Sequence, residues 1–234
     1  MVFEPPLECG TLVRRYKRFL ADVLTERGEL LTMHCANTGA MLGCAEPGSI
    51  VWYSRSNRSA RKYAHTLELV RTAVGHLVGV NTNRANALVA EAIQQQRVAE
   101  VPGGIAGREV RIPDERGRFD FVVLGADGSN TFVEVKSVTM LRDGVGAFPD
   151  APSERATRHV QALERLSLAG ERAVLIFCVQ HTGISCMTTA DEIDPTYAAA
   201  LRAAHTSGVV VAAYRTSINT EGMELGDPVP VELG

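Results

Sequence analysis

The sequence predicts an α/β protein of the α+β kind, with an all-β N-terminal part and a C-terminal mixed sheet flanked by helices. Two observations lead to this fold class. Residues 1–80 consist of short runs of β-forming residues separated by glycines and turn residues. Beyond residue 80, helical periodicity alternates with short apolar runs. Because 234 residues suffice for two small domains, we place a boundary between residues 82 and 83.

Six runs in residues 1–80 have the composition of strands, at 12–13, 18–24, 29–35, 49–54, 63–72 and 76–80. Several short, closely spaced strands are typical of a small barrel, and a domain of this size suits the five-stranded oligonucleotide-binding (OB) type. We therefore expect an OB-like barrel at residues 1–82.

Two clusters of basic and aromatic residues lie in the predicted barrel, from Arg14 to Phe19 and from Arg55 to Tyr63. Cations beside aromatic rings suit a groove that holds phosphates and stacks bases. A solvated basic surface is the ordinary alternative. Residues 1–80 carry ten Lys and Arg against seven Asp and Glu, a balance of +3, and the rest carries fourteen against twenty, or −6. The candidate nucleic-acid contacts are Arg14, Arg15, Lys17, Arg18, Arg55, Arg58, Arg61 and Lys62.

A turn sequence from His34 to Met41 follows the third predicted strand. Asn37 and Gly39 permit unusual backbone angles there. We add Asn37 and Thr38 as candidate ligand contacts, although a purely structural turn explains the sequence equally well.

The second part contains, in order, a helix, three strands, a helix, a strand, a helix and a strand. Apolar spacing predicts the first helix over 83–96. Ser153 is the expected N-cap of a helix that Gly170 ends, and Asp194 followed by Pro195 begins another that ends near residue 207. Strands are expected at 108–112, 118–124, 131–138, 173–179 and 209–214.

The strands at 118–124 and 131–138 form a predicted hairpin, because the turn signal Asp127-Gly128 separates them. Side chains alternate along a strand, so Glu134 and Lys136 share one face. A two-residue loop would send the Asp120 carboxylate to the other face. We expect a three-residue loop at 126–128 with Gly128 in the left-handed conformation. That register places Asp120 opposite Glu134, with Cβ atoms about 5 Å apart.

Two carboxylates that close repel, so either one carries a proton or a cation lies between them. Carboxylate oxygens suit a hard ion such as Mg²⁺ or Mn²⁺, which also keeps waters and phosphate oxygens. Lys136 would lie beside this ion, where it can stabilise phosphate charge or help deprotonate a water. These residues indicate phosphodiester hydrolysis, with Asp120, Glu134 and Lys136 as catalytic residues and the two carboxylates as metal ligands.

Two alternatives stay open for this group. The first is a buried ion pair with only a structural role. The second takes the acidic member from one of two Pro-Asp dipeptides, at Asp114 or Asp150, although turn-like sequence surrounds both. We prefer Asp120 because a strand holds it rigidly.

The composition, with 45% hydrophobic residues, is typical of a soluble globular protein. No apolar run is long enough to span a bilayer, and the first residues lack the basic start and apolar stretch of a signal peptide. We therefore expect a cytoplasmic location and no membrane partner.

The order of elements, with Asp120 and Glu134-Val-Lys136 on neighbouring strands, resembles the restriction-endonuclease-like fold and its P-D…(D/E)-x-K signature. The whole chain resembles the sugar fermentation stimulation protein (SfsA) family of bacteria and archaea. The segments that carry this resemblance are Arg15-Tyr-Lys-Arg-Phe-Leu-Ala-Asp22, His34-Cys-Ala-Asn-Thr-Gly-Ala-Met41, Val80-Asn-Thr-Asn83, Phe132-Val-Glu-Val-Lys-Ser-Val-Thr139, Phe148-Pro-Asp-Ala151 and Glu154-Arg155 with His159.

The resemblance implies an OB-like barrel at 1–82 joined to a nuclease-like domain at 83–234. It also implies DNA binding with little sequence preference and a link to the regulation of sugar (maltose) utilisation. Carried over by position, the nuclease-like pattern makes Asp120 and Glu134 metal ligands and Lys136 the catalytic lysine. It adds Glu91, on the first helix of the domain, as a further ligand.

Two other expectations concern the surroundings of this site. Arg155 and His159 lie one helical turn apart, so both are candidates to reach a phosphate, with a helix-surface role as the alternative. The long connection at 139–152 contains Gly144, Gly146 and Pro149, and we expect it to act as a lid over substrate.

Three functional hypotheses follow. The first is a DNA-binding protein whose barrel holds the nucleic-acid backbone. The second is a Mg²⁺-dependent or Mn²⁺-dependent nuclease that cuts DNA, RNA or a nucleotide-containing small molecule. The third is a metabolite sensor built on the turn at 37–39. The first two are compatible with one another.

Overall fold

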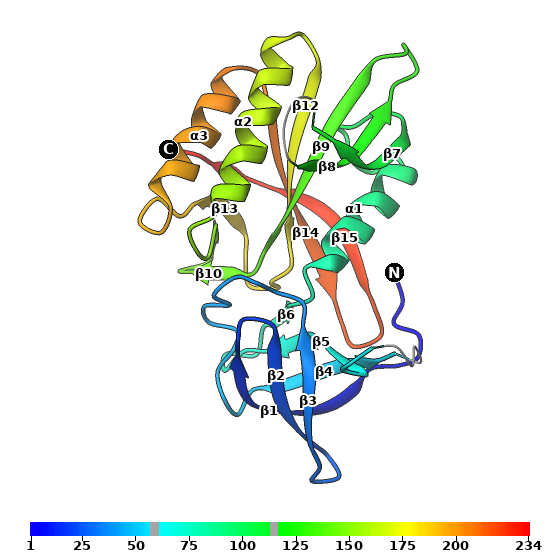
Figure 1. Ribbon diagram of the computed structural model, residues 1–234, viewed down its shortest axis with the longest axis vertical. Coiled ribbons are helices and arrows are strands. Elements are labelled where there is room, and N and C mark those ends of the chain that lie inside the picture. Colours follow the sequence, from blue (N-terminus) through cyan, green and yellow to red (C-terminus); the bar gives the residue numbers. More distant parts are fainter. Residues whose placement is uncertain (57–60, 113–116) are drawn as a thin grey trace.

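A β-barrel lies at one end of the molecule, and a helix-flanked mixed sheet lies at the other (Figure 1). The computed structural model describes residues 1–56, 61–112 and 117–234. Arg58 and Asp114, which the sequence offered as candidates, fall outside the described residues. In the part of the chain that is described, no helix combines the length and the hydropathy needed to cross a membrane.

The barrel consists of β1 (Glu8–Tyr16), β2 (Leu20–Thr25), β3 (Leu30–Cys35), β4 (Ile50–Arg55) and β5 (His65–Arg71). Neighbouring strands follow the order β3-β2-β1-β4-β5, and parallel pairing of β3 with β5 closes the ring. A sixth strand, β6 (Leu77–Gly79), pairs with β5. The inward positions bury apolar side chains such as Leu12, Val23, Met33 and Leu67. The predicted OB-like barrel is confirmed.

The second part is built on a six-stranded mixed sheet in the order β15-β14-β12-β9-β8-β7. Its strands are β7 (Gly104–Arg111), β8 (Arg118–Leu124), β9 (Asn130–Val138), β12 (Arg172–Val179), β14 (Val210–Ile218) and β15 (Met223–Val229). The first three are antiparallel, and β12 and β14 run parallel to β9. The unpredicted β15 is an edge strand, where Gly226 and Pro228 are tolerated because one side of the strand needs no pairing.

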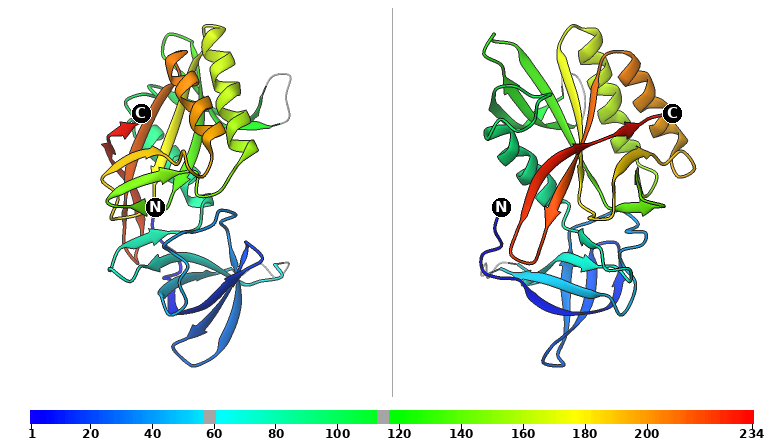
Figure 2. Two further views of the ribbon diagram at one scale, coloured as in Figure 1. Left: turned by 90° about the vertical axis from the view of Figure 1, so that its left-hand side faces the viewer. Right: turned by 180° about the vertical axis from the view of Figure 1, so that it is seen from behind.

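Three helices cover the sheet from both sides (Figure 2). α1 (Asn83–Gln94) packs on one face, and α2 (Glu154–Leu168) and α3 (Pro195–Thr206) pack side by side on the other. The predicted N-caps Ser153 and Asp194 are confirmed, because Ser153 Oγ accepts a bond from Ala156 N at 3.2 Å and Asp194 Oδ1 accepts one from Tyr197 N at 2.9 Å. Two separate apolar cores therefore flank the sheet.

The β8–β9 hairpin has the predicted register. Phe121 pairs with Val133 and Leu124 with Asn130, so the same register continued by one residue places Asp120 opposite Glu134. The turn contains Gly128 at φ 82°, in the left-handed region. β9 lies between β8 and β12, as its two apolar faces predicted.

The connection at 139–152 differs from the expected lid. It contains β10 (Met140–Arg142) and β11 (Val145–Phe148), which form a hairpin, and β11 pairs in parallel with β13 (Cys186–Thr189). A fourth short strand, β16 (Val231–Glu232), completes this small sheet. Backbone pairing therefore fixes much of the connection as a wall.

A buried polar network joins the barrel to the second part. Glu68 on β5 is 2% exposed, and Arg84 on α1 donates to its two carboxylate oxygens at 2.7 and 3.0 Å. Ser54 and Asn81 donate to the same carboxylate at 2.7 and 2.9 Å. A carboxylate with four donors is a stable anchor, because nearly every lone-pair direction is satisfied.

Glu68→Ala should lower the free energy of unfolding by about 2–4 kcal/mol, because it leaves Arg84, Ser54 and Asn81 without their shared acceptor. Urea denaturation measures this change. Glu192→Ala is the control, since it breaks an ion pair with Arg142 in which both side chains are about half exposed, and it should cost less than about 1 kcal/mol. Equal losses in the two variants would contradict the anchoring role.

Candidate active site

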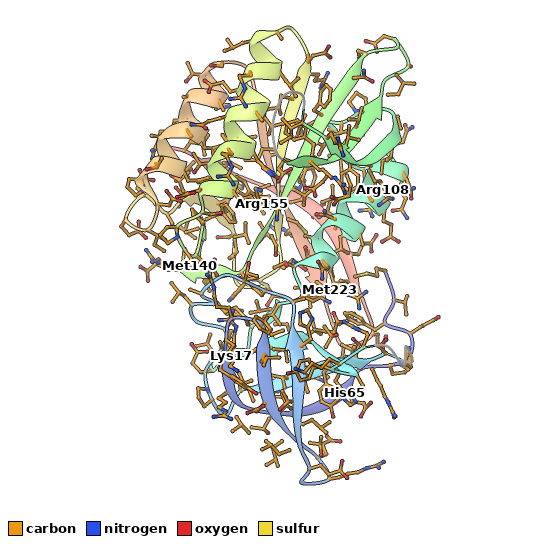
Figure 3. All side chains as sticks on the ribbon, in the orientation of Figure 1. Lys17, His65, Arg108, Met140, Arg155 and Met223 are labelled. Atoms are coloured by element: carbon orange, nitrogen blue, oxygen red, sulfur yellow. The ribbon has the colours of Figure 1, made fainter. Side chains whose placement is uncertain are left out.

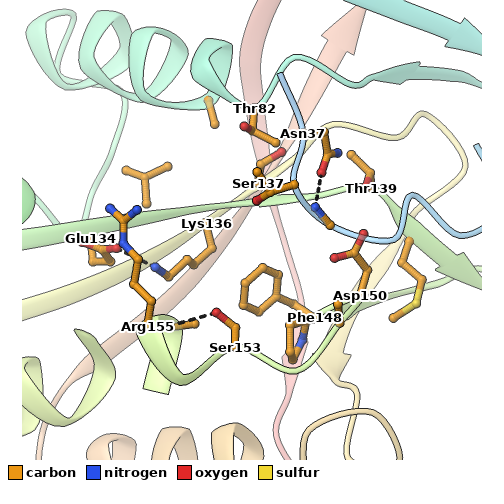
Figure 4. Close-up of a pocket in the computed structure, with 18 of the residues that line it drawn as sticks. Asn37, Thr82, Glu134, Lys136, Ser137, Thr139, Phe148, Asp150, Ser153 and Arg155 are labelled. Carbon is orange, nitrogen blue, oxygen red and sulfur yellow. Dashed lines mark hydrogen bonds and ion pairs between the residues drawn. The ribbon is translucent and has the colours of Figure 1, made fainter. Parts of the chain in front are cut away.

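A cleft of about 430 Å³ opens between the barrel and the second part (Figure 4). Figure 3 places Lys17 on the barrel and Arg155 across the junction from it. The barrel contributes Arg18 and the turn at 37–39 to the lining. The second part contributes residues from α1, β7, β8, β9, the small sheet and the start of α2, and those with polar side chains are Asn83, Asn86, Glu109, Asp120, Glu134, Lys136, Ser137, Thr139, Asp150, Ser153 and Arg155.

Glu134 lies in the floor of this cleft with its side chain 4% exposed. Its Oε1 accepts hydrogen bonds from Lys136 Nζ and from His159 Nδ1, both at 2.5 Å. Its Oε2 is buried and has no partner among the described residues. Burial alone would raise the pKa of Glu134, but the charge of Lys136 and the bonds from Lys136 and His159 outweigh it and hold the pKa below its ordinary value. The interior therefore contains a charged carboxylate of which only one oxygen accepts hydrogen bonds from described residues.

Asp120 adjoins this carboxylate where β8 and β9 separate. The backbone N–H of Val135 donates to Asp120 Oδ2 at 2.7 Å. The Asp120 side chain therefore takes the place of the backbone carbonyl that accepts such a bond in a regular strand pair. Asn86 on α1 donates to Oδ1 at 2.6 Å. Burial and the nearby charge of Glu134 raise the pKa of Asp120 to about 6. The two carboxylates are thus close enough to influence one another, as the predicted register required.

The donor set fits a hard divalent cation. Glu134 Oε2 is an orphaned buried acceptor, and Asp120 supplies a second carboxylate whose proton is held only weakly near neutral pH. Within residues 1–56, 61–112 and 117–234, no group of three His, Cys, Asp or Glu side chains forms a ready metal cage.

Two predicted members of the site need correction. Glu91 does not line the cleft, because it lies five residues after Asn86, about 140° around α1, and its carboxylate instead contacts the amino group of Met1 at 3.0 Å. His159 is 2% exposed and contacts Glu134, so it is neither a phosphate contact nor a helix-surface residue. Arg155, one turn earlier, is exposed and lines the cleft.

Several cleft residues were not identified from the sequence, and two of them, Asn86 and Glu109, adjoin Asp120. Asn86 lies on the predicted helix, but no pattern distinguished it from the other polar helix positions. Glu109 lies opposite Asp120, between the Arg108–Phe121 and Val110–Phe119 pairs, and has a φ of 50°. Its strand was predicted, but the sequence analysis assigned no register between this strand and the next.

The first basic cluster is partly structural. Arg15 Nη2 donates to the carbonyl oxygens of Arg18, Asn37 and Gly39 at 2.7, 2.9 and 2.8 Å. Its guanidinium therefore fixes the turn at 37–39, which corrects its expected role at a phosphate. Arg14 pairs with the buried Asp22 at 2.7 Å, yet its side chain remains 65% exposed.

The other predicted contacts divide between two hollows. Arg18, Asn37 and Thr38 line the cleft, whereas Arg55 lines a separate hollow on the barrel. Lys17, Arg61 and Lys62 are exposed, and neither hollow includes them. Among the described residues, the two basic clusters therefore share neither of these hollows.

The chain therefore belongs to a class of proteins in which an OB-like barrel is joined to a helix-flanked mixed sheet, here with a buried carboxylate pair and a lysine on the sheet. Two family models match the chain: the SfsA N-terminal OB domain at residues 13–80, and the sugar fermentation stimulation protein RE domain at residues 83–222. The chain belongs to the sugar fermentation stimulation protein (SfsA) family.

A solved structure agrees with this assignment. The SfsA protein of Pyrococcus furiosus, solved in complex with Ca²⁺, superposes with a TM-score of 0.90 and 25% identity, over 99% of this chain and 98% of that one. A repair endonuclease from Pyrococcus abyssi aligns over 88% of this chain and 87% of that one, with a TM-score of 0.31 and 14% identity. The second likeness is too distant to support an argument.

Asp120→Asn should stabilise the protein at pH 7.5 without metal. A raised pKa means that folded Asp120 holds a proton between pH 3.8 and about 6, where the unfolded chain has released it, so stability falls as the pH rises through this window. Removing the charge should restore about 1–3 kcal/mol above pH 6. Thermal unfolding with and without Mn²⁺ measures both stability and metal binding.

Mn²⁺ should raise the melting temperature of the wild type at pH 7.5, less so at pH 5.5, and not that of Asp120→Asn. Glu109→Gln is a control for stability without metal, because this side chain is exposed. A difference in stability between the wild type and Asp120→Asn that stays the same from pH 4 to pH 7.5 would refute the raised pKa.

Proposed function

We propose that this protein is a divalent-cation-dependent phosphodiesterase that acts on nucleic acid in the cleft between its two domains. The observation that carries the proposal is the orphaned Oε2 of Glu134, buried beside a carboxylate whose pKa is raised to about 6 and a lysine 2.5 Å from the opposite oxygen. In an ion pair with only a structural role, we would expect every buried acceptor to have a hydrogen-bond donor.

Each residue has a distinct task in this proposal. Asp120 and Glu134 would hold the cation. When bound, Mg²⁺ or Mn²⁺ supplies Lewis acidity to the phosphodiester and lowers the pKa of a bound water. His159 and Lys136 both donate to Oε1 and so orient Glu134 with Oε2 left over. Lys136 also places a positive charge in the cleft, where it stabilises the charge of the reacting phosphate.

The other cations of the cleft support nucleic acid as the substrate. Arg155 at the start of α2 and Arg18 on the barrel line the same space from opposite sides. The N-terminus of α2 adds backbone N–H groups and the positive end of a helix dipole. Charges of this kind recognise phosphate without reading base sequence, so we propose binding to DNA, RNA or a nucleotide end with little sequence preference.

The family name connects these proteins with sugar fermentation. A role in regulating sugar (maltose) utilisation is a further proposal, and it rests on that name. It is compatible with hydrolysis, because a regulator of this kind binds nucleic acid through the same cations.

Lys136→Ala should reduce the rate of phosphodiester cleavage by about 10²–10⁴-fold, since it removes the only ammonium group in the cleft lining that is described. The measurement is release of labelled fragments from single-stranded DNA, duplex DNA and RNA with Mg²⁺ or Mn²⁺. Arg158→Ala is the control, because this exposed residue of α2 pairs with Glu154 and does not line the cleft. Undiminished cleavage by Lys136→Ala would assign the activity to another site.

Arg18→Ala should weaken nucleic-acid binding and lower the slope of log K against log salt by about 1, because one phosphate contact is lost. Fluorescence anisotropy at several salt concentrations measures the slope. Arg142→Ala should leave it unchanged, since Arg142 pairs with Glu192 and does not line the cleft. A slope that is the same for wild type and Arg18→Ala would exclude Arg18 from the interface.

A further inference from the structure

Glu109 has an unusual backbone conformation for a residue inside a strand. Among the described residues, six other than glycine have a positive φ, and five of them lie in turns or loops: Lys17, Arg18, Met41, Gln96 and Asp143. Glu109, with a φ of 50°, lies within β7. The left-handed region is unfavourable for a residue with a Cβ, and strain of this kind clusters at functional sites. The conformation therefore directs attention to what the Glu109 side chain does.

Glu109 lies in line with the two carboxylates of the candidate metal site. It lies opposite Asp120, and Asp120 lies opposite Glu134. Because β7, β8 and β9 are neighbours in the sheet, the three acidic residues form a row across adjacent strands. All three line the same cleft. Glu109 thus brings a third carboxylate to the side of Asp120 that faces away from Glu134.

The acidic residues of the cleft differ in their partners. Asp120 accepts two hydrogen bonds, and Asp150 accepts one from the backbone N–H of Met41 at 2.9 Å. Glu109 is exposed, and its side chain makes no hydrogen bond or ion pair with another described residue. The buried Oε2 of Glu134 is also without a partner in the described structure, on a side chain that is 4% exposed. Two acceptors in this row, one buried and one mobile in solvent, are therefore available to a ligand.

The charges around Glu134 Oε2 favour a third carboxylate. Asp120, Glu134 and Lys136 bring two negative charges and one positive charge when all are ionised. The charge of Glu109 makes the excess equal to that of one divalent cation, and bound cations are held by such matched charges. The carboxylates do not yet surround a common point, since no group of three forms a cage among the described residues. Glu109 can turn toward a cation, because its exposed side chain has three rotatable bonds and no partner to lose.

We propose that Glu109 is a third carboxylate of the cation site, and that its side chain closes onto a divalent cation held by Asp120 and Glu134. The contact is direct or passes through one of the waters that such an ion keeps. This inference rests on the proposed phosphodiesterase, because it assigns a further residue to the same site. The role of Glu109 is to hold the cation, and the phosphate contacts remain those of Arg18, Lys136 and Arg155.

Mn²⁺ binding in the absence of nucleic acid tests this role. Electron paramagnetic resonance measures free Mn²⁺ and so gives the Kd of each variant at pH 7.5. Glu109→Gln should raise the Kd about 10–100-fold and leave the melting temperature without metal unchanged. Glu109→Asp keeps the charge and tolerates a positive φ, so it should recover part of the lost affinity.

Glu154→Gln is the matched control for the loss of one negative charge. Glu154 is exposed and adjoins Arg155 in the chain, but it does not line the cleft. This variant should bind Mn²⁺ as the wild type does. A Kd that is the same in the wild type and Glu109→Gln, or one that rises equally in Glu109→Gln and Glu154→Gln, would overturn the proposal.

Cleavage of labelled nucleic acid over a range of Mn²⁺ concentrations separates this inference from the phosphodiesterase itself. Glu109→Gln should need about 10–100-fold more Mn²⁺ than the wild type to reach half of its maximal rate. If the two proteins show the same Mn²⁺ dependence, the phosphodiesterase stands and the role of Glu109 is refuted. If the wild type cuts no substrate but its Mn²⁺ affinity depends on Glu109, the cation site stands and the hydrolytic function is refuted.

Discussion

The buried carboxylate of Glu134 is the constraint on which the site depends. A charge on the central strand of a sheet is tolerated only when partners replace the lost water. Lys136 on the same strand and His159 on α2 supply them to one oxygen, and the other oxygen has none in the described structure. The contact between His159 on α2 and Glu134 on β9 therefore matters for the proposed chemistry, because it helps decide which carboxylate oxygen remains free to bind a cation.

The cleft is a property of the junction between the domains. Arg18 and the turn at 37–39 come from the barrel, whereas the carboxylates come from the sheet. The Glu68–Arg84 network and the Asp150–Met41 bond hold the two walls of the cleft in a fixed position across the domain boundary. Neither domain alone would form the enclosed space. This explains why an OB-like barrel, which elsewhere binds nucleic acid on its own face, here also serves as one wall of a site on its neighbour.

Local sequence patterns predicted most of the fold and the centre of the site. Strand alternation and the Asp127-Gly128 turn act over a few residues, and they predicted the register that pairs Asp120 with Glu134. The two helix caps are equally local signals. The missed features depend on contacts between distant segments. The Asp150–Met41 bond joins residues 109 positions apart, and the role of Arg15 depends on carbonyl groups of a turn more than twenty residues away. Glu91 was misassigned because helical rotation, and not chain order, decides which side chain reaches the cleft.

The two parts of the chain carry net charges of opposite sign, which would guide the approach of a nucleic acid. Residues 81–234 carry a balance of −6, so their field alone would repel a polyanion, whereas residues 1–80 carry +3. A nucleic acid, the proposed substrate, would therefore be attracted first to the barrel. Within the cleft, Arg18, Lys136 and Arg155 provide local positive charge. Attraction at long range would thus come from the barrel, while orientation at short range would come from these cations on both walls of the cleft.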